Sequence, residues 1–348
     1  MSQSSDTAKD KSGRRYPLRM PPGWTPPYPS FMSEFDAARR SASMVVMGCQ
    51  FEDGDRATAF EFVSRMVLLA EAEGKADHAD LSSCEADSAG RAQFVMTGYW
   101  LKPDALEHFF ESAAFQTLWQ RHSAEALPHG IFREVFNVPL ERFETLHSDP
   151  THLVGVAHAR EEVTDPIDRH AYWGSMRDRI PASADNPFDP SGTIEILEQS
   201  ANRILLRPGE NLAVIRSGQD LGGVHGQERE EYYGEVEPVL NAGMAFLRDQ
   251  GAEVNCLDCR YMVFVDGSGE KTDHTFGLAY FRSLSDLENW SEHHPTHLAI
   301  FNAFLEFAPR YGPAMKSRYW HEVSVLPAQS QIAEYVNCAP GTGLLSGL

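Results

Sequence analysis

Residues 93–122, QFVMTGYWLKPDALEHFFESAAFQTLWQRH, decide the fold because a later part of the chain follows the same pattern. The pattern predicts a strand at Gln93–Trp100 and an amphipathic helix at Asp104–His122. Five apolar or acidic positions recur later at a constant offset: Tyr99, Trp100, Leu106, Glu107 and Phe109 match Tyr280, Phe281, Leu287, Glu288 and Trp290. The match indicates two copies of one structural unit.

The elements around each copy follow the same order, β-α-β-β-α-β. In the first copy we predict, besides the strand and helix above, elements at Ser41–Glu52, Arg56–Ala72, His78–Cys84 and Gly130–Val138. In the second copy we predict elements at Asn211–Ser217, Glu228–Gln250, Glu253–Asp266, His274–Arg282, Leu284–Arg310 and Arg318–Leu326. The predicted fold class is therefore α+β, with duplicated ferredoxin-like units packed sheet to sheet as a dimeric α+β barrel around a cavity.

The predicted organisation has five parts. Residues 1–30 are rich in Pro and Ser and form an N-terminal arm, and residues 331–348 form a turn-rich C-terminal tail. The first ferredoxin-like half spans 31–140 and the second spans 211–330. Residues 141–210 are an inserted connecting segment, in which a short helix is predicted at Ala171–Arg179.

Composition excludes several classes of function. The chain has 348 residues and a formal net charge of −20, which argues against nucleic acid or an anionic membrane as a partner. It has no apolar run long enough for a transmembrane helix and no apolar core typical of a secretory signal. Its five cysteines favour a reducing compartment, so we expect a cytoplasmic protein. Cys256 and Cys259 have C-x-x-C spacing, but they lie in a predicted strand and are interpreted as inert.

The two copies differ where chemistry is expected. His297 takes the place of Gln116, His321 takes the place of Arg133, and Ser217 lies opposite Gly48 or Cys49. His297 could be a surface histidine, one of a zinc pair with His293, or the axial ligand of a haem, which needs one imidazole and a large apolar pocket. His321 could be a hydrogen-bonded core residue or an acid/base near neutral pH. Arg177 and Arg179 are candidates for a cavity wall, or they end a solvated helix.

Five motifs in order resemble the aldoxime dehydratase family, including its phenylacetaldoxime dehydratase members. They are YWGSMRDR (172–179), IRSGQD (215–220), HPTHL (294–298), HEVSV (321–325) and YVNCAPGTGLL (335–345), with FETL (143–146) as a further match. The resemblance implies a haem b-dependent enzyme with a fold akin to chlorite dismutases and dye-decolorising peroxidases. It also implies dehydration of R-CH=N-OH to R-C≡N and water, and a homodimer.

The resemblance carries over five residue roles. His297 resembles the axial haem ligand, His321 the distal acid/base, Ser217 the hydroxyl-binding serine, Arg179 the distal arginine and Glu144 a distal carboxylate. Arg179 is preferred to Arg177 from the alignment of one motif. Ferrous haem is expected in the active form, with flavin or another external reductant. Two alternatives remain: a haem peroxidase or chlorite-dismutase-like oxidoreductase, and a non-catalytic haem-binding protein.

Overall fold

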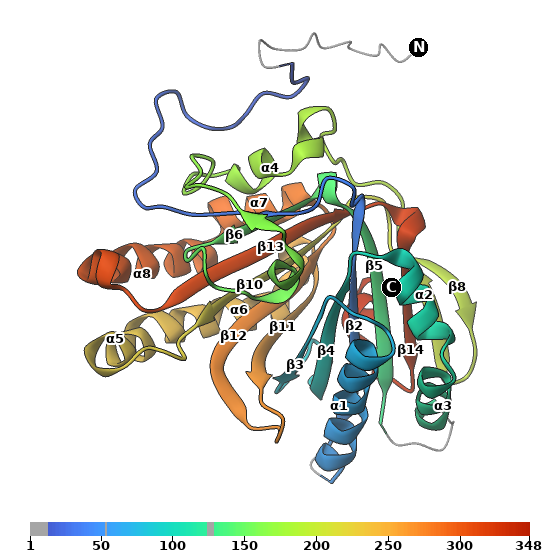
Figure 1. The fold of residues 1–348 in the computed structure, drawn as a ribbon. Coiled ribbons are helices and arrows are strands. Elements are labelled where there is room, and N and C mark those ends of the chain that lie inside the picture. The colour runs from blue at the N-terminus through green and yellow to red at the C-terminus, as the bar shows by residue number, and fades with distance from the viewer. Residues whose placement is uncertain (1–12, 53, 124–128) are drawn as a thin grey trace.

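The computed structural model describes residues 13–52, 54–123 and 129–348. Twelve strands form one antiparallel sheet in the order β6-β13-β10-β12-β11-β3-β4-β2-β5-β14-β9-β8, and β1 (Ser33–Glu34) pairs with β7 (Glu162–Val163). The large sheet and the helices packed on it confirm the α+β prediction (Figure 1). The N-terminal arm predicted at residues 1–30 includes residues 1–12, which lie outside the described residues.

The first half of the chain forms one end of the sheet. Its elements are β2 (Ser41–Phe51), α1 (Arg56–Ala72), β3 (His78–Cys84), β4 (Ala92–Trp100), α2 (Pro103–Glu111), α3 (Ala113–His122) and β5 (Ile131–Pro139). The predicted single helix at 104–122 is wrong, because Ser112 ends α2 in an extended conformation and accepts a hydrogen bond from the Phe115 amide as the N-cap of α3.

The second half forms the other side of the sheet. Its elements are β10 (Leu212–Asp220), α5 (Gly226–Glu231), α6 (Glu237–Gln250), β11 (Cys256–Val265), β12 (Lys271–Phe281), α7 (Leu284–His293), α8 (Pro295–Tyr311) and β13 (Arg318–Leu326). The helix predicted at 228–250 contains a π-helical segment at Tyr232–Val236. The strand predicted from Glu253 begins at Cys256, because Asn255 adopts a left-handed conformation with φ of 55°.

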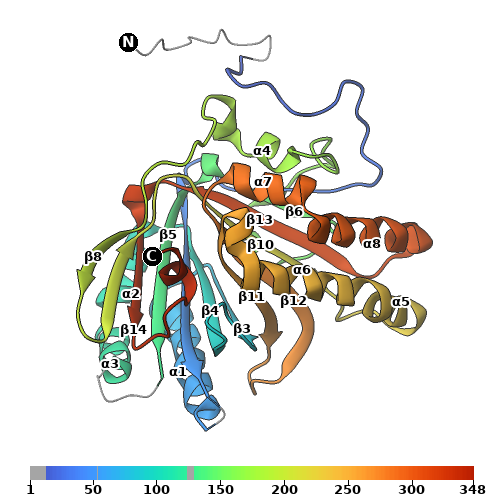
Figure 2. The same cartoon turned by 180° about the vertical axis from the view of Figure 1, so that it is seen from behind.

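The strands of both halves follow one spatial order. The first half reads β3-β4-β2-β5, the second reads β11-β12-β10-β13, and β11 pairs with β3 to join them. The sheet bends at this junction, so the two halves face each other while α1–α3 and α5–α8 cover the outer faces (Figures 1 and 2). The interior between the halves is filled by large side chains from both, including Tyr99, Phe132, Phe136, Phe276, Tyr280 and Trp320.

The connecting segment and the tail complete the sheet. The segment contributes β6 (Phe143–His147), α4 (Ser175–Arg179), β8 (Glu195–Gln199) and β9 (Arg203–Arg207). The helix predicted at Ala171 begins later, because Ala171 and Gly174 have φ of 58° and 88°. The tail begins with a strand that was not predicted, β14 (Gln331–Val336), which pairs with β5 and β9, and turns and bends follow it as expected. Within the described residues, no helix is both long and apolar enough to cross a membrane.

Candidate active site

His321 and Ser217 lie on adjacent strands of the second half. β13 pairs with β10 in a register that makes Ser217 and His321 direct Cα partners. Antiparallel partners in register present their side chains on the same face of the sheet, so the imidazole and the hydroxyl project to the same side. Ser217 is exposed, and its hydroxyl makes no hydrogen bond within the described residues, so it is free to bind a ligand.

His321 is bound by a buried ion pair. Nε2 of His321 lies 2.8 Å from Nη2 of Arg179 and 3.0 Å from Oε1 of Glu144. Arg179 also donates from Nε to Oε2 of Glu144 at 2.7 Å, and the side chains of both residues are 0% exposed. Glu144 comes from β6, which pairs with β13, and Arg179 is the last residue of α4. The connecting segment therefore supplies both charged partners of the imidazole.

The charges at this ion pair are fixed at neutral pH. Burial would raise the pKa of Glu144, but Arg179 and His321 outweigh it and lower that pKa to about 2. The carboxylate stays ionised, and the guanidinium stays protonated. Neutral His321 can accept at Nε2 from Arg179, whereas protonated His321 can donate from the same nitrogen to Glu144. Both protonation states of the imidazole therefore have a partner.

Arg177 has a different position from Arg179. It donates to both carboxylate oxygens of Glu288 on α7, at 3.0 Å and 3.1 Å from Nε, and to the Ser285 hydroxyl at 3.0 Å. Its contacts fix α4 against α7. The geometry therefore favours Arg179 over Arg177 as the arginine beside His321.

His297 lies in the first turn of α8. Pro295 begins the helix and His294 is its N-cap, so His293, at the end of α7, belongs to a different helix. No group of three or more potential metal-binding side chains occurs in the part of the chain that the structure describes, so a zinc pair with His293 is not favoured. The His297 ring packs edge-on against Trp290 and Trp173, at 4.7 Å and 6.0 Å between centroids.

The His297 ring suits an axial ligand. Its Nδ1 is buried with no hydrogen-bond partner in the described residues. Burial lowers the pKa of His297 to about 4, and the nearby Ser291 backbone offsets this only in part. The imidazole is therefore neutral at neutral pH, which is the form that binds iron.

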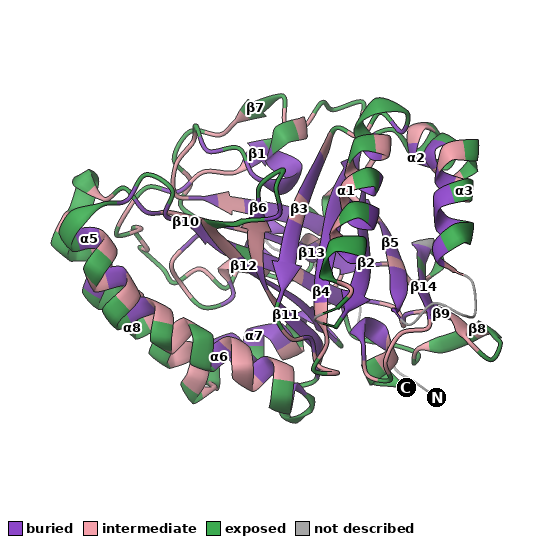
Figure 3. Ribbon diagram, turned by 90° about the horizontal axis from the view of Figure 1, so that it is seen from below, coloured by how far each residue is buried: buried purple, intermediate pink, exposed green. Residues whose placement is uncertain are grey.

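The rest of α8 fits a large apolar ligand. The helix carries five large aliphatic or phenylalanine side chains besides Phe307: Leu298, Ile300, Phe301, Phe304 and Leu305. Phe307 alone among the residues of this fully described helix is buried, and the others are partly or fully exposed (Figure 3). A helix with large apolar side chains that the protein covers only in part offers the apolar surface that a haem requires beside its axial histidine.

α8 lies on the side of the sheet that presents His321. Its Phe304 packs edge-on against Tyr319 of β13, with ring centroids 4.9 Å apart. Tyr319 and His321 are two residues apart on one strand, so their side chains share a face. The two histidines predicted from sequence therefore lie on elements that face each other. The structure brings Ser217, His321, Arg179 and Glu144 together, and it places His297 on a helix that packs against the strand of His321.

Comparison with known proteins identifies the family. The profile of the haem-containing dehydratase family matches residues 45–344. The chain is 35% identical to the aliphatic aldoxime dehydratase of Rhodococcus erythropolis, over 94% of this chain and 93% of that protein. It is 32% identical to the phenylacetaldoxime dehydratase of Bacillus sp. strain OxB-1, over 74% of each.

Solved structures agree with this result. A crystal structure of an aldoxime dehydratase in complex with butyraldoxime superposes with a TM-score of 0.91 at 34% identity, covering 96% of this chain and 93% of that one. A second aldoxime dehydratase structure gives a TM-score of 0.90 at 33% identity and covers 98% of each chain. The chain therefore belongs to the haem-containing dehydratase family.

Proposed function

We propose that this chain is a haem-dependent lyase that dehydrates aldoximes, R-CH=N-OH, to nitriles and water. The observation that carries the proposal is the imidazole of His321, held between Glu144 and Arg179 in register with the unpaired hydroxyl of Ser217. Loss of water from an aldoxime needs a proton for the departing oxygen and a base for the carbon-bound hydrogen. A single histidine that has a hydrogen-bond partner in each protonation state can supply both.

The chain's residues have distinct roles in this reaction. His297 holds haem b, which in the ferrous state supplies the metal centre for the oxime nitrogen. Ser217 donates a hydrogen bond that orients the oxime hydroxyl toward His321. Protonated His321 gives a proton to the departing hydroxyl oxygen, and neutral His321 then takes the proton from carbon. Arg179 and Glu144 keep the imidazole at one position through both steps.

Several further features belong to the same proposal. An external reductant, flavin among the candidates, keeps the iron ferrous. The two halves, 31–140 and 211–330, are duplicated ferredoxin-like units, and the common strand order of the halves supports this. The arm (1–30), the connecting segment (141–210) and the tail (331–348) complete the organisation, and two copies form a homodimer. The five free cysteines, four of them buried, support a cytoplasmic location.

The test is an anaerobic assay of the haem-loaded protein reduced with dithionite. Phenylacetaldoxime and butyraldoxime are offered separately, and nitrile is measured by gas chromatography while the optical spectrum is recorded. We expect nitrile from at least one oxime, and none from the His321→Ala variant at equal haem content. Peroxide-dependent dye oxidation without nitrile would instead identify a peroxidase, and a haem spectrum without either activity would identify a haem-binding protein.

A further inference from the structure

A buried polar cluster lies on the interior face of β10 and β13, the strands that carry Ser217 and His321. Arg216 precedes Ser217 on β10, Glu322 follows His321 on β13, and Arg216 and Glu322 are themselves Cα partners. Successive side chains of a strand point to opposite faces, so these two point into the interior between the halves. The arginine is 1% exposed and the glutamate 2%.

The partners of Arg216 and Glu322 come from the other half of the chain. The Tyr99 hydroxyl on β4 donates to Oε2 of Glu322 at 2.5 Å and accepts from Nη1 of Arg216 at 2.7 Å. Asp80 on β3 accepts from Nη2 of Arg216 at 3.0 Å and 3.2 Å. We call these four residues the rear cluster. Its hydrogen bonds connect the strands that carry Ser217 and His321 to β3 and β4.

The connecting segment closes the rear cluster. The Val156 amide donates to Oε1 of Glu322 at 2.7 Å. Gly155 has φ of 53°, and a Cβ on it would lie 2.2 Å from the same oxygen. Glycine is therefore required there, both for the left-handed backbone and for the close approach to Glu322. Glu322 thus contacts the first half, the second half and the segment that supplies Glu144 and Arg179.

We infer that Tyr99, Asp80, Arg216 and Glu322 are positioning residues for the dehydration, which hold β10 and β13 so that Ser217 and His321 meet one substrate. The inference rests on the proposed function. The physical reason is that the cluster is buried and that its polar atoms, apart from Nε of Arg216, are hydrogen-bonded, so the interior side of both strands is held in place. A ligand on the front face then meets a hydroxyl and an imidazole whose separation does not vary.

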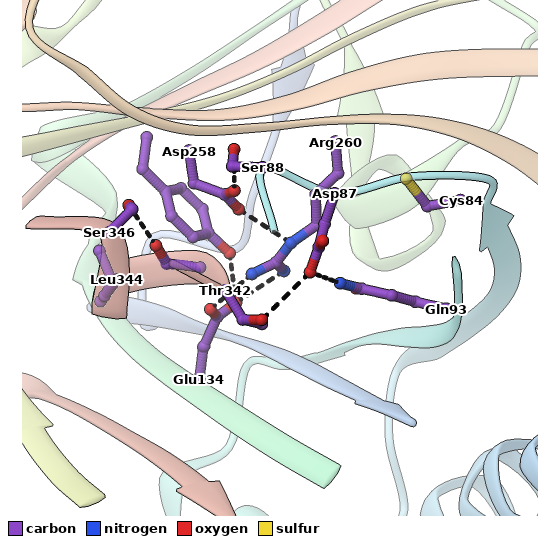
Figure 4. Close-up of polar contacts among 12 residues, drawn as sticks. Cys84, Asp87, Ser88, Gln93, Glu134, Asp258, Arg260, Thr342, Leu344 and Ser346 are labelled. Atoms are coloured by element: carbon purple, nitrogen blue, oxygen red, sulfur yellow. Dashed lines mark hydrogen bonds and ion pairs between the residues drawn. The ribbon is translucent and has the colours of Figure 1, made fainter. Parts of the chain in front are cut away.

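The chain contains a matched control for this inference. Glu134 on β5 and Tyr280 on β12 occupy the places in the other half that Glu322 and Tyr99 occupy. The Tyr280 hydroxyl donates to Oε2 of Glu134 at 2.5 Å. Nη2 of Arg260 donates to Oε1 of Glu134 at 2.8 Å (Figure 4). This second cluster is equally buried, but the residue in front of it is Arg133, which has no place in the proposed reaction.

The experiment compares Tyr99→Phe with Tyr280→Phe in the haem-loaded, reduced enzyme. Each variant removes one buried hydroxyl that donates to a buried glutamate. We expect the larger decrease in melting temperature in Tyr99→Phe, because the Tyr99 hydroxyl also accepts from Arg216, whereas Glu134 keeps hydrogen bonds from Tyr335 and Arg260. Tyr99→Phe should lower kcat about tenfold, with KM and haem content within about twofold. Tyr280→Phe should leave kcat within about twofold. Glu322→Gln and Glu134→Gln form a second pair, should either tyrosine variant fail to fold.

Amide hydrogen exchange in the haem-free protein provides a readout that does not depend on turnover. In Tyr99→Phe, the amides of β10 and β13 should exchange faster, whereas in Tyr280→Phe the effect should fall on β5. Equal kcat for the two folded variants, or unchanged exchange at β10 and β13, would overturn the inference. A parent enzyme that makes no nitrile would refute the proposed function instead, and the exchange result would still decide whether the cluster fixes the strand pair.

Discussion

Ser217 and His321 are direct cross-strand partners on β10 and β13, with both side chains on the face that α8 packs against. Because strand pairing fixes the separation of the two Cα atoms, the hydroxyl and the imidazole can act on one small molecule without a loop movement. The charged partners of the imidazole come from β6 and α4, so the site is built on secondary structure elements throughout.

Replacing Ser217 by alanine should affect turnover and little else. The hydroxyl is exposed and has no protein partner in the described residues, so its loss should change the free energy of unfolding by no more than about 0.5 kcal/mol. We expect kcat/KM to fall about 100-fold with a normal Soret band, because the oxime hydroxyl loses its orienting donor. Steady-state kinetics at equal haem content check this, and unchanged kinetics would remove Ser217 from the mechanism.

His297→Ala should abolish stoichiometric haem binding. The neutral, partly exposed imidazole is the one histidine on α8, and most of the large apolar side chains of this helix are partly exposed as well. His293→Ala is the matched control, since His293 is exposed at the end of α7 and should retain the parent Soret band. A titration of haem into both haem-free variants distinguishes them. A parent-like spectrum in His297→Ala would show that the axial ligand is another residue.

Haem should bind once per chain, although the first half contains a cavity. A cavity of about 510 Å³ lies there, lined among others by Gln116 and Arg133, the residues that match His297 and His321. An amide and a guanidinium that is bonded to Glu334 supply no axial base for iron. Pyridine haemochrome absorbance divided by protein concentration should give a ratio near one. A ratio near two that Gln116→Ala halves would contradict this.

Much of this site could be predicted from sequence because two parts of the chain follow the same pattern. Strand alternation places His321 on the apolar face of β13, and the differences between the copies single out His297 and Ser217. The contact of Arg179 with Glu144 could not be predicted, since it joins α4 to β6 through tertiary packing alone.

The rear cluster was missed for a related reason. Tyr99 and Tyr280, and Glu322 and Glu134, are visible in the sequence as matches between the two copies. Pattern alone suggests that matched residues play equivalent parts within each half. The structure shows that each tyrosine instead bonds to the glutamate of the other half. This pairing of each tyrosine with the opposite glutamate depends on how the two halves of the sheet face each other. No local spacing in the sequence encodes it.

Arg179→Ala should destabilise the protein and stop turnover. The substitution leaves the Glu144 carboxylate buried without its main partner, which costs about 3–5 kcal/mol. The double variant Arg179→Met/Glu144→Gln should recover most of the stability and none of the activity, because the imidazole still lacks both charged partners. Arg177→Ala should retain turnover in the folded fraction, since Arg177 bonds to Glu288 on α7. Urea unfolding and nitrile formation measure the two effects separately.

Acid should destabilise the haem-free protein partly through His297. Burial lowers the pKa of this histidine to about 4, so between its ordinary value of 6.5 and about 4 the unfolded chain binds a proton that the folded chain does not. Stability from this group is complete above pH 6.5 and is lost as the pH falls toward 4. At pH 4.5 the loss amounts to about 2.5 kcal/mol.

Other buried histidines also make the unfolding free energy of the parent protein depend on pH. The variant His297→Phe therefore isolates the contribution of His297. The difference in unfolding free energy between pH 7 and pH 4.5, measured with urea on haem-free protein, should be smaller in His297→Phe than in the parent by about 2.5 kcal/mol. His293→Phe, on an exposed position, should keep the parent slope. An identical change of unfolding free energy with pH in all three proteins would mean that His297 has the same pKa in the folded and the unfolded chain. A histidine with that pKa is solvated, and it could not be the partly buried base that α8 presents to a haem.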